Sequence, residues 1–261
     1  LEDYLQTEWP ELDVYLTSVT DHYSTASICG PNSKKILTKI FPDKDFNDDA
    51  FPHMSYQNAK INGINCRIMR ISFTGELSYE INIDSKYGKS LWEKCIEAGK
   101  EFKITPYGTE TMHLLRAEKG FIIVGQDTDG TMTPIDLQMD WIVSKKKYDF
   151  IGKRSLYRSD TIREDRKQLV GLLTENPEEV LEEGAQIVAD IKKSPIEMLG
   201  HVTSSYYSPN LKKSIALGVV KGGKNMLGQK LIIPMENKNI NVTVADPVFL
   251  DKEGERLNAK L

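Results

Sequence analysis

Residues 69–83, MRISFTGELSYEINI, carry the pattern that decides the fold of the first part of the chain. Apolar residues alternate with polar ones on both sides of the turn sequence Thr74-Gly75-Glu76; they are Met69, Ile71 and Phe73, then Leu77, Tyr79, Ile81 and Ile83. Because successive side chains of a strand point to opposite faces, this alternation predicts a β-hairpin in which each strand buries one face. The chain is expected to reverse at Glu76.

Glu76 is a charged residue that the hairpin itself does not require. A carboxylate can accept two parallel charge-assisted hydrogen bonds from a planar pair of N–H donors, such as the edge of an aminopyrimidine ring. A glutamate at a turn is more often simply solvated. The residues of the hairpin leave both interpretations open.

The composition describes a folded protein without a strong charge bias. Its 261 residues are 39% apolar and 8% aromatic, which is enough for one large or two ordinary domains. Lysine and arginine total 34 against 38 acidic residues, and the net charge of −4 offers no general attraction for nucleic acid or anionic lipid. The three cysteines have no C-x-x-C spacing, so we expect reduced thiols in the cytoplasm, no disulfide framework and no metal site.

The start of the chain lacks the features of a native N-terminus. It begins with Leu1 rather than methionine, and LEDYLQTEWP resembles the end of a helix. We therefore expect a piece of a longer protein whose first domain is incomplete. No stretch approaches the roughly 20 apolar residues of a membrane span, and no basic-then-apolar leader opens the chain, so no membrane role is expected.

Strand and helix signals alternate through residues 1–157. Strands are indicated by β-branched or continuous apolar runs, and helices by a capping residue at the start and glycine at the end. The expected strands include 14–20, 24–29 and 121–124, and the expected helices run from Ser33 to Lys39, from Ser85 to Gly99 and from beyond Pro106 to Lys119. These elements favour a mixed or antiparallel sheet with helices packed on it.

Polar residues follow the expected strand 121–124, at a place well suited to a site. The D-x-D-G pattern at Asp127 resembles the start of a calcium loop, but Thr131 and Gln138 stand where further ligands are needed, which excludes an EF-hand. We interpret His113 as a structural residue of its helix and the lysines at 145–147 as solvated surface.

The charged stretch 158–167, RSDTIREDRK, separates two different patterns. We interpret it as a linker between a domain at 1–157 and a domain at 168–261. Six short strand-like runs with glycine turns follow it, at 169–173, 186–188, 198–203, 215–220, 230–233 and 240–244. They predict a small β-barrel, so the fold class is α+β with a carboxy-terminal barrel.

Four stretches carry a family resemblance, whereas no Ser-His-Asp arrangement, Walker loop, G-x-G-x-x-G or H-E-x-x-H motif occurs. They are FTGELSYEI at 73–81, TPYGTETMHLLRAEKGFIIVGQDTDGT at 105–131, KKKYDFIGKRSL at 145–156 and GHVTSSYYSPNLKKSIALGVV at 200–220. In this order they resemble the glycine-cleavage T-protein family of aminomethyltransferases. Within it they look most similar to the carboxy-terminal region of the sarcosine oxidase α-subunit branch.

The resemblance implies a domain for tetrahydrofolate-dependent one-carbon transfer. It matches Glu76 to the family's pterin-binding glutamate and Arg116 to an arginine of the folate pocket. Phe73 and Val124 stand where T-proteins usually carry tyrosine, which fits the sarcosine oxidase branch better. The folate-site residues expected on this basis are Glu76, Arg116, Phe73, Tyr79, Gln126, Asp127 and Trp141.

The catalytic residue stays unassigned, because the family's catalytic aspartate lies upstream of the matching region. FAD, FMN or NAD are expected only on other segments or subunits of a sarcosine oxidase-type complex. The expected partners are folate, an amine-derived one-carbon donor, and either such subunits or a second copy of the chain.

Three functions remain open on the sequence. The first is transfer of a formaldehyde-level carbon from an oxidised N-methyl amine to tetrahydrofolate, which forms 5,10-methylenetetrahydrofolate and depends mainly on positioning and exclusion of water. The second is a T-protein that acts on a lipoyl-bound aminomethyl group. The third is a non-catalytic module that binds folate or docks to other subunits.

Overall fold

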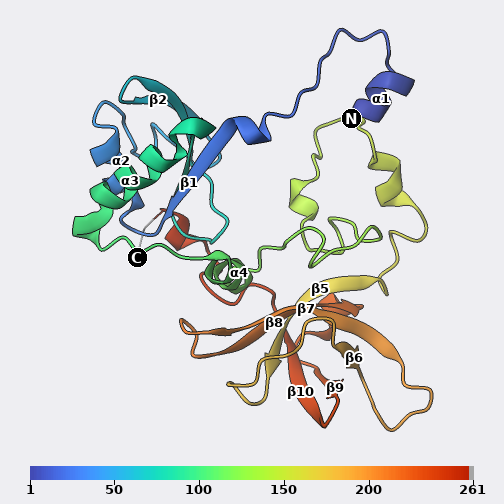
Figure 1. Cartoon of the computed structure of the whole chain (residues 1–261). Coiled ribbons are helices and arrows are strands. Elements are labelled where there is room, and N and C mark those ends of the chain that lie inside the picture. The colour runs from blue at the N-terminus through green and yellow to red at the C-terminus, as the bar shows by residue number, and fades with distance from the viewer. Residues whose placement is uncertain (259–261) are drawn as a thin grey trace. The chain divides into compact units, whose positions relative to one another are not determined.

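The computed structural model describes residues 1–258 and divides the chain into two compact units (Figure 1). The first unit contains Leu1–Ser72, Glu76–Pro106 and, at the end of the described chain, residues 256–258. The second unit contains Phe73–Gly75 and Tyr107–Glu255. Residues 107–157 group with the barrel in the second unit, whereas the sequence analysis places them in the first domain. The boundaries of the compact units therefore differ from those of the expected domains.

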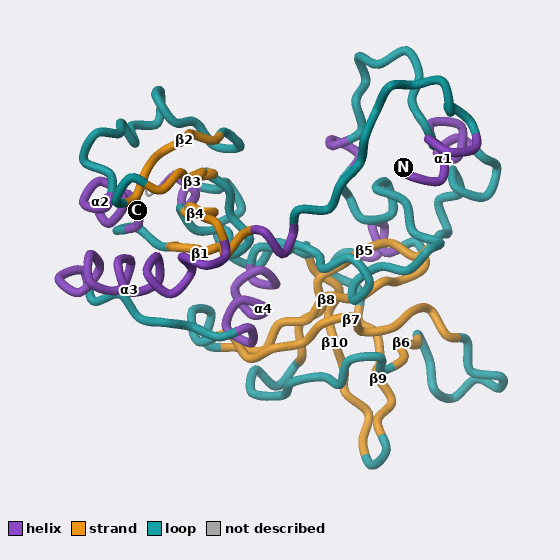
Figure 2. Tube along the Cα trace, turned by 45° about the horizontal axis from the view of Figure 1, so that its top comes forward, coloured by secondary structure: helices purple, strands orange, loops and turns teal. Residues whose placement is uncertain are grey.

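The first unit is built on one four-stranded antiparallel sheet. Its strands are β1 (Tyr23–Cys29), β2 (Tyr56–Ile61), β3 (Ile64–Met69) and β4 (Ser78–Asp84). The strand order is β1-β4-β3-β2, and Figure 2 shows the four strands next to one another in this order. The predicted strand at 24–29 is thus confirmed as β1.

The predicted hairpin exists as β3 and β4, with Ile68 opposite Ile81. The loop is longer than predicted, because β3 ends at Met69 and the chain rejoins the sheet only at Ser78. The next residue, Arg70, instead exchanges backbone hydrogen bonds with the loop before β2 and has its side chain buried. The reversal near Glu76 is therefore confirmed, but Ile71 and Phe73 lie in the loop.

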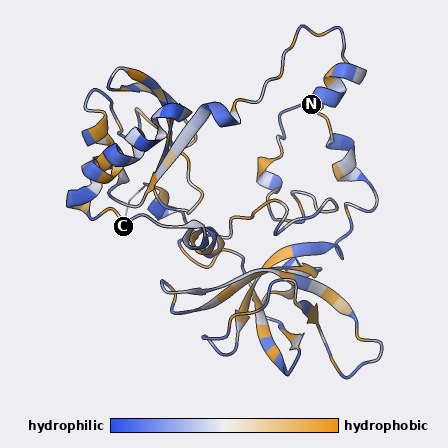
Figure 3. Ribbon diagram, in the orientation of Figure 1, coloured by the Kyte–Doolittle hydropathy of each residue, from blue (hydrophilic) through white to orange (hydrophobic). Residues whose placement is uncertain are grey.

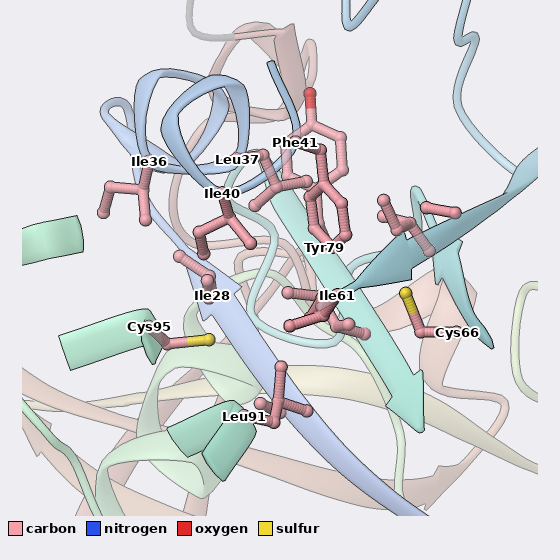
Figure 4. Packing of buried hydrophobic residues seen from close by; sticks show 14 of the residues in the cluster. Ile28, Ile36, Leu37, Ile40, Phe41, Ile61, Cys66, Tyr79, Leu91 and Cys95 are labelled. Atoms are coloured by element: carbon pink, nitrogen blue, oxygen red, sulfur yellow. The ribbon is translucent and has the colours of Figure 1, made fainter. Parts of the chain in front are cut away.

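Two helices cover one face of this sheet and close its core. They are α2 (Ser33–Ile40) and α3 (Gly88–Gly99), and both carry polar and apolar residues (Figure 3). Their apolar side chains join those of the strands in one cluster, whose labelled members in Figure 4 are Ile28, Ile36, Leu37, Ile40, Phe41, Ile61, Cys66, Tyr79, Leu91 and Cys95. The alternation of the strands therefore places one face of the sheet in the core.

Both helices start differently from the sequence expectation. Ser33 does not cap α2, because its Oγ donates to Leu77 O. The chain after β4 first forms the 3-10 turn η2 (Ser85–Tyr87), which Asp84 caps by accepting a hydrogen bond from Lys86 N. A carboxylate is a good cap acceptor, so Asp84 takes the place predicted for Ser85.

The N-terminal segment of the first unit has little regular structure. It contains α1 (Glu2–Thr7) and the 3-10 turn η1 (Thr20–His22), and a further 3-10 turn η3 (Lys100–Phe102) follows α3. The predicted strand at 14–20 is wrong, because this stretch does not pair with any strand that the structure describes. A β-branched sequence needs a neighbouring strand before its backbone groups are satisfied as a sheet.

The first part of the second unit contains one helix and several loops. The helix is α4 (Thr109–Glu118), as predicted, and the 3-10 turns η4 (Asp140–Ile142) and η5 (Lys153–Tyr157) follow. The predicted strand at 121–124 is wrong. The backbone turns there, with Gln126 N and Asp127 N both donating to Ile123 O.

The barrel closes the second unit and confirms all six predicted strands. They are β5 (Lys167–Thr174), β6 (Gln186–Val188), β7 (Met198–Ser208), β8 (Lys213–Lys221), β9 (Lys230–Met235) and β10 (Lys238–Ala245), with the 3-10 turns η6 (Gly223–Met226) and η7 (Glu255–Asn258) nearby in sequence. The order β10-β5-β8-β7-β6-β9 is closed, which leaves no unpaired edge. Helix α4 packs against β7 and β8, which brings its last turn next to the barrel wall.

No helix among residues 1–258 is long and apolar enough to cross a membrane.

Candidate functional site

Glu76 lies in the β3–β4 loop and faces the C-terminal turn η7. Its Oε1 accepts a hydrogen bond from Arg256 Nη1 at 2.8 Å, and 18% of its side chain is exposed. The backbone supports this contact, because Leu77 N donates to Arg256 O at 2.9 Å. The loop and the turn therefore hold each other by both backbone and side-chain bonds.

Arg70 fixes the start of the same loop from inside the first unit. Its buried guanidinium donates from Nη1 to Phe51 O at 2.7 Å and from Nη2 to Asn258 Oδ1 at 2.9 Å. Its Nη1 also lies 2.9 Å from Asp48 Oδ1, and hydrogen bonding from Lys34, with the charge of Arg70, lowers the pKa of the Asp48 carboxyl. These bonds make the loop a fixed support for Glu76.

The carboxylate of Glu76 is thus oriented toward a planar cation. A guanidinium presents N–H groups in one plane, as an aminopyrimidine edge does. A ligand with that edge would meet a carboxylate already held in place, and it would either share the carboxylate with Arg256 or replace that guanidinium. The arrangement is suited to binding, since the carboxylate is already held in one orientation by Arg256.

Two hydroxyls of the loop are buried without a hydrogen-bond partner among the described residues. They are Ser72 Oγ and Thr74 Oγ1. Buried polar groups are usually paired, so unpaired ones often mark a place where a ligand or water completes the structure. Phe73, between them, keeps 37% of its surface exposed, which leaves an aromatic face available for stacking.

Gly75 has a packing role in the second unit. Its φ is +80°, and a Cβ there would lie 2.8 Å from Lys119 Cγ. Lys119 is held in turn by the Asp251 carboxylate, with Nζ 3.2 Å from Oδ2. Only glycine meets both the backbone conformation and the close approach.

Arg116 and Asp127 form a buried ion pair in the second unit. Nη1 of Arg116 lies 2.5 Å from Asp127 Oδ2, and both side chains are completely buried. The same guanidinium donates to Phe121 O at 3.1 Å and from Nη2 to Ser204 Oγ at 2.7 Å. Arg116 therefore joins α4, the following turn and strand β7.

Asp127 accepts hydrogen bonds on both carboxylate oxygens. Oδ1 receives Thr203 Oγ1 at 2.6 Å and Ser204 Oγ at 2.7 Å, while Oδ2 also receives Ile123 N at 2.8 Å. Both oxygens of this buried carboxylate therefore have hydrogen-bond donors. Neither Asp127 nor Arg116 presents its side chain to a ligand in this structure.

Gln126 lies at the exposed side of this network. Its Nε2 donates to Ser204 Oγ and to Glu183 Oε1, each at 3.1 Å. The Tyr206 ring lies near as well, with its centroid 6.0 Å from Arg116 Cζ. The structure thus brings together three of the expected site residues, Arg116, Gln126 and Asp127.

Tyr79 and Trp141 lie in different settings. Tyr79 is fully buried on β4 among Phe46 and Phe51, and burial raises its pKa to about 12. Trp141 lies in η4 with 74% of its surface exposed. In this structure Tyr79 supports the sheet, and Trp141 is available for a contact that the described residues do not make.

Four residues of these networks could not be found from the sequence: Arg256, Thr203, Ser204 and Glu183. Arg256 is 180 positions from Glu76, and Ser204 is 77 positions from Asp127. Thr203 and Ser204 lie within the family-like stretch 200–220, but no local pattern marks the role of any of the four, because these roles arise only when distant segments meet. Among residues 1–258, no group of three or more His, Cys, Asp or Glu side chains is placed to hold a metal ion.

Two family descriptions match the chain. The GCVT N-terminal domain matches residues 1–147, and the glycine cleavage T-protein C-terminal barrel domain matches residues 167–251. The second match coincides with the closed barrel of the structure. A crystal structure of glycine cleavage system aminomethyltransferase T from Bartonella henselae has the same fold, with a TM-score of 0.73 and 22% identity over 88% of this chain and 60% of that chain.

Relatives of two kinds are similar in sequence. Sarcosine oxidase subunit alpha from Corynebacterium sp. (strain P-1) is 52% identical over 98% of this chain, and the same subunit from Rhizobium meliloti (strain 1021) is 38% identical over 99%. This chain spans 27% and 26% of their lengths. Aminomethyltransferase from Thermoanaerobacter pseudethanolicus is 31% identical over 92% of this chain and 63% of that protein. The chain belongs to the glycine cleavage T-protein family.

Proposed function

We propose that this chain is a tetrahydrofolate-binding domain for one-carbon transfer in a protein of the sarcosine oxidase α-subunit type. The carbon would come from an oxidised N-methyl amine, and the product would be 5,10-methylenetetrahydrofolate. The observation that carries the proposal is the Glu76 carboxylate, which the hydrogen-bonded β3–β4 loop and Arg256 hold in a defined orientation. Similarity to the sarcosine oxidase subunits supports the assignment to that type.

The residues of the loop fit a reduced folate. The oriented carboxylate of Glu76 matches the N–H edge of a pterin ring, and the exposed ring of Phe73 offers a stacking surface. The unpaired hydroxyls of Ser72 and Thr74 could take up further polar groups. In this proposal Glu76 and Phe73 touch the folate directly.

The second unit contributes a supporting set of residues. Arg116 and Asp127 hold the turn 121–127 against β7, and this turn carries Gln126 at its exposed side. On the resemblance to the family we assign Gln126 and Trp141 to folate binding, and within the second unit Arg116 and Asp127 support Gln126. Tyr79 contributes from β4, the strand that follows Glu76, by packing its side chain into the core.

Bound tetrahydrofolate would supply the nitrogen atoms that take up the one-carbon unit. The residues of this chain would bind the pterin, fix its orientation and keep water away, which are the main requirements when the carbon is already electrophilic. Other subunits or segments of a cytoplasmic complex would hold FAD, FMN or NAD and supply the oxidised amine.

Calorimetric titration of tetrahydrofolate into the full-length gene product tests the proposal. Glu76→Gln should weaken binding at least about tenfold, because a buried charged hydrogen bond contributes about 1.5–3 kcal/mol. Glu93→Gln, on the exposed surface of α3, is the matched control and should leave the affinity unchanged. Equal affinities of the unaltered protein and Glu76→Gln would exclude Glu76 as the pterin ligand.

A T-protein activity on a lipoyl-bound aminomethyl group is the second candidate, because an aminomethyltransferase is 31% identical over 240 residues. Formation of methylenetetrahydrofolate is then measured with formaldehyde as donor and with an aminomethyl-loaded lipoyl protein. A requirement for the lipoyl protein would select the T-protein activity. Folate binding without either transfer would select the third possibility, a non-catalytic module.

A further inference from the structure

The first unit contains a cavity of about 550 Å³ on the face of its sheet that α2 and α3 do not cover. Asn58, Arg67 and Asn82 line it, and each alternates along its strand with a residue of the core. The cavity volume lies within the range of small-molecule sites, about 300–1,000 Å³. Glu76, the residue proposed above to bind the pterin, is not among the residues that line it.

A polar row crosses all four strands at this cavity. The register places Asn58 opposite Arg67, Arg67 opposite Asn82, and Asn82 opposite Thr25. Directly opposed side chains on one face of a sheet lie within reach of each other. Four polar residues in one row, on a face without a covering helix, form a continuous surface of hydrogen-bonding groups.

Arg67 is fixed within this row by two neighbours. Its Nε donates to Asn58 Oδ1 at 3.3 Å, and its Cζ lies 4.9 Å from the centroid of the Tyr56 ring. The cation–π contact with the ring and the hydrogen bond at Nε together hold the guanidinium beside the cavity. The fork of Nη atoms is therefore preorganised for a planar anion.

Asn82 supplies a second donor. Its Oδ1 accepts a hydrogen bond from Thr25 Oγ1 at 2.7 Å, which fixes the orientation of the amide. Its Nδ2 is buried and has no hydrogen-bond partner in the part of the chain that the structure describes. A buried amide nitrogen without an acceptor marks a place where an added oxygen atom would be bound favourably.

The remaining lining is largely apolar. Val19, Tyr23 and Met69 contribute to the wall, so a ligand would place an apolar body against them. Glu80 lies two positions before Asn82 on the same face of β4, opposite Met69 in the register. It does not line the cavity. The charge that the cavity presents is thus the positive charge of Arg67.

We propose that this cavity binds a small organic carboxylate, with the carboxylate on Arg67 and Asn82 and the apolar body against Met69 and Tyr23. Such a carboxylate could be an independent organic acid or the glutamate end of a folate. The shared chemistry is a carboxylate attached to an apolar or aromatic group.

Titration of the chain with sodium benzoate, followed by ¹⁵N NMR, tests this site. Benzoate should shift the side-chain amide signal of Asn82, whereas benzamide, which lacks the charge, should shift it little. Arg67→Gln should raise the dissociation constant at least about tenfold, since it removes the charge-assisted pair. Lys89→Gln, an exposed charge change on α3, should change it less than about twofold.

Asn82→Asp is the second variant, and it preserves the oxygen that accepts from Thr25. It replaces the amide donor with a negative charge, so benzoate binding should be lost while circular dichroism stays unchanged. Glu76→Gln should leave benzoate binding intact, because Glu76 does not line the cavity. A parallel titration with p-aminobenzoylglutamate distinguishes the sources: tighter binding than benzoate points to the folate tail, and weaker binding to an independent acid.

Three results would overturn the proposal. They are equal binding of benzoate by Arg67→Gln and the unaltered chain, equal binding of benzamide and benzoate, and tighter binding of inorganic phosphate than of either carboxylate.

Discussion

Arg116 and Asp127, eleven positions apart in the chain, form an ion pair with 2.5 Å between Nη1 and Oδ2 and no exposed surface on either side chain. Ser204 on β7 bonds to both partners. The pair therefore fixes the turn 121–127 to the barrel. By fixing this turn, the ion pair also holds Gln126 in place next to Ser204.

Asp127→Asn is expected to destabilise the second unit by roughly 3–5 kcal/mol, because it leaves a buried guanidinium without its countercharge. Urea unfolding measured by circular dichroism gives the change. Asp165→Asn breaks an exposed pair with Arg163 and should cost less than about 1 kcal/mol. Similar losses for both variants would show that the burial of the Arg116 pair does not matter.

Tyr79→Phe is expected to stabilise the first unit by about 1 kcal/mol. Tyr79 Oη is buried, and among the described residues it has no hydrogen-bond partner, so removing it ends an uncompensated desolvation cost. Tyr15→Phe changes a hydroxyl on a fully exposed ring and serves as control, with less than about 0.5 kcal/mol expected. A clear loss of stability in Tyr79→Phe would mean that the hydroxyl has a partner in solution.

Alkaline pH should destabilise the protein through the same residue. Burial raises the pKa of Tyr79 from 10.0 to about 12, so above pH 10 the unfolded chain binds fewer protons than the folded one. The unfolding free energy then falls with rising pH, by at most about 1.4 kcal/mol per pH unit, until the pH reaches the folded pKa. Tyr79→Phe should lack this contribution to the pH dependence of the unfolding free energy. Burial also raises the pKa values of Cys66 and Cys95 to about 11, and their contribution should be the same in the unaltered protein and in Tyr79→Phe.

Gly200→Ala should disrupt the barrel. A Cβ at Gly200 would lie 1.8 Å from Val219 O on the neighbouring strand, so β7 and β8 could not keep their spacing. We expect a loss above about 3 kcal/mol, or failure to fold. Gly130→Ala, with open space around the added carbon, should change the unfolding free energy by less than about 0.5 kcal/mol.

The contact of Glu76 with Arg256 can be measured by a double-mutant cycle of Glu76→Gln and Arg256→Gln. The pair is partly exposed, so a coupling of about 0.5–1 kcal/mol is expected from unfolding of the single and double variants. The coupling should fall with added salt. A coupling indistinguishable from zero would mean that the side-chain contact of Glu76 with Arg256 does not contribute to the stability of the folded state.

The barrel and the core face of the first sheet follow from local sequence patterns. Local patterns determine which side chains are buried, because the two-residue period of a strand depends only on neighbouring residues. Examples are the alternation at Ile81 and Ile83 and the apolar run at Val219 and Val220. The turn position of Glu76 follows from the same pattern. Family resemblance, rather than spacing, identified it as a candidate ligand.

The predicted strands at 14–20 and 121–124 are wrong for a related reason. A strand requires a neighbour that satisfies its backbone groups, and a local apolar or β-branched run does not say whether one exists. Residues 121–124 turn instead, with Arg116 O and Ile123 O accepting the backbone donors. The pairing, not the propensity, decides the structure there.

The sequence by itself determined the six barrel strands, helices α2, α3 and α4, the reversal near Glu76 and the family. Only the tertiary structure decided that Arg256 faces Glu76, that Ser204 joins Arg116 to Asp127, and that Arg67 and Asn82 share a row beside a cavity. These contacts join residues far apart along the chain. A local pattern encodes which face of an element is buried, but which distant side chain meets it depends on how all the elements pack together.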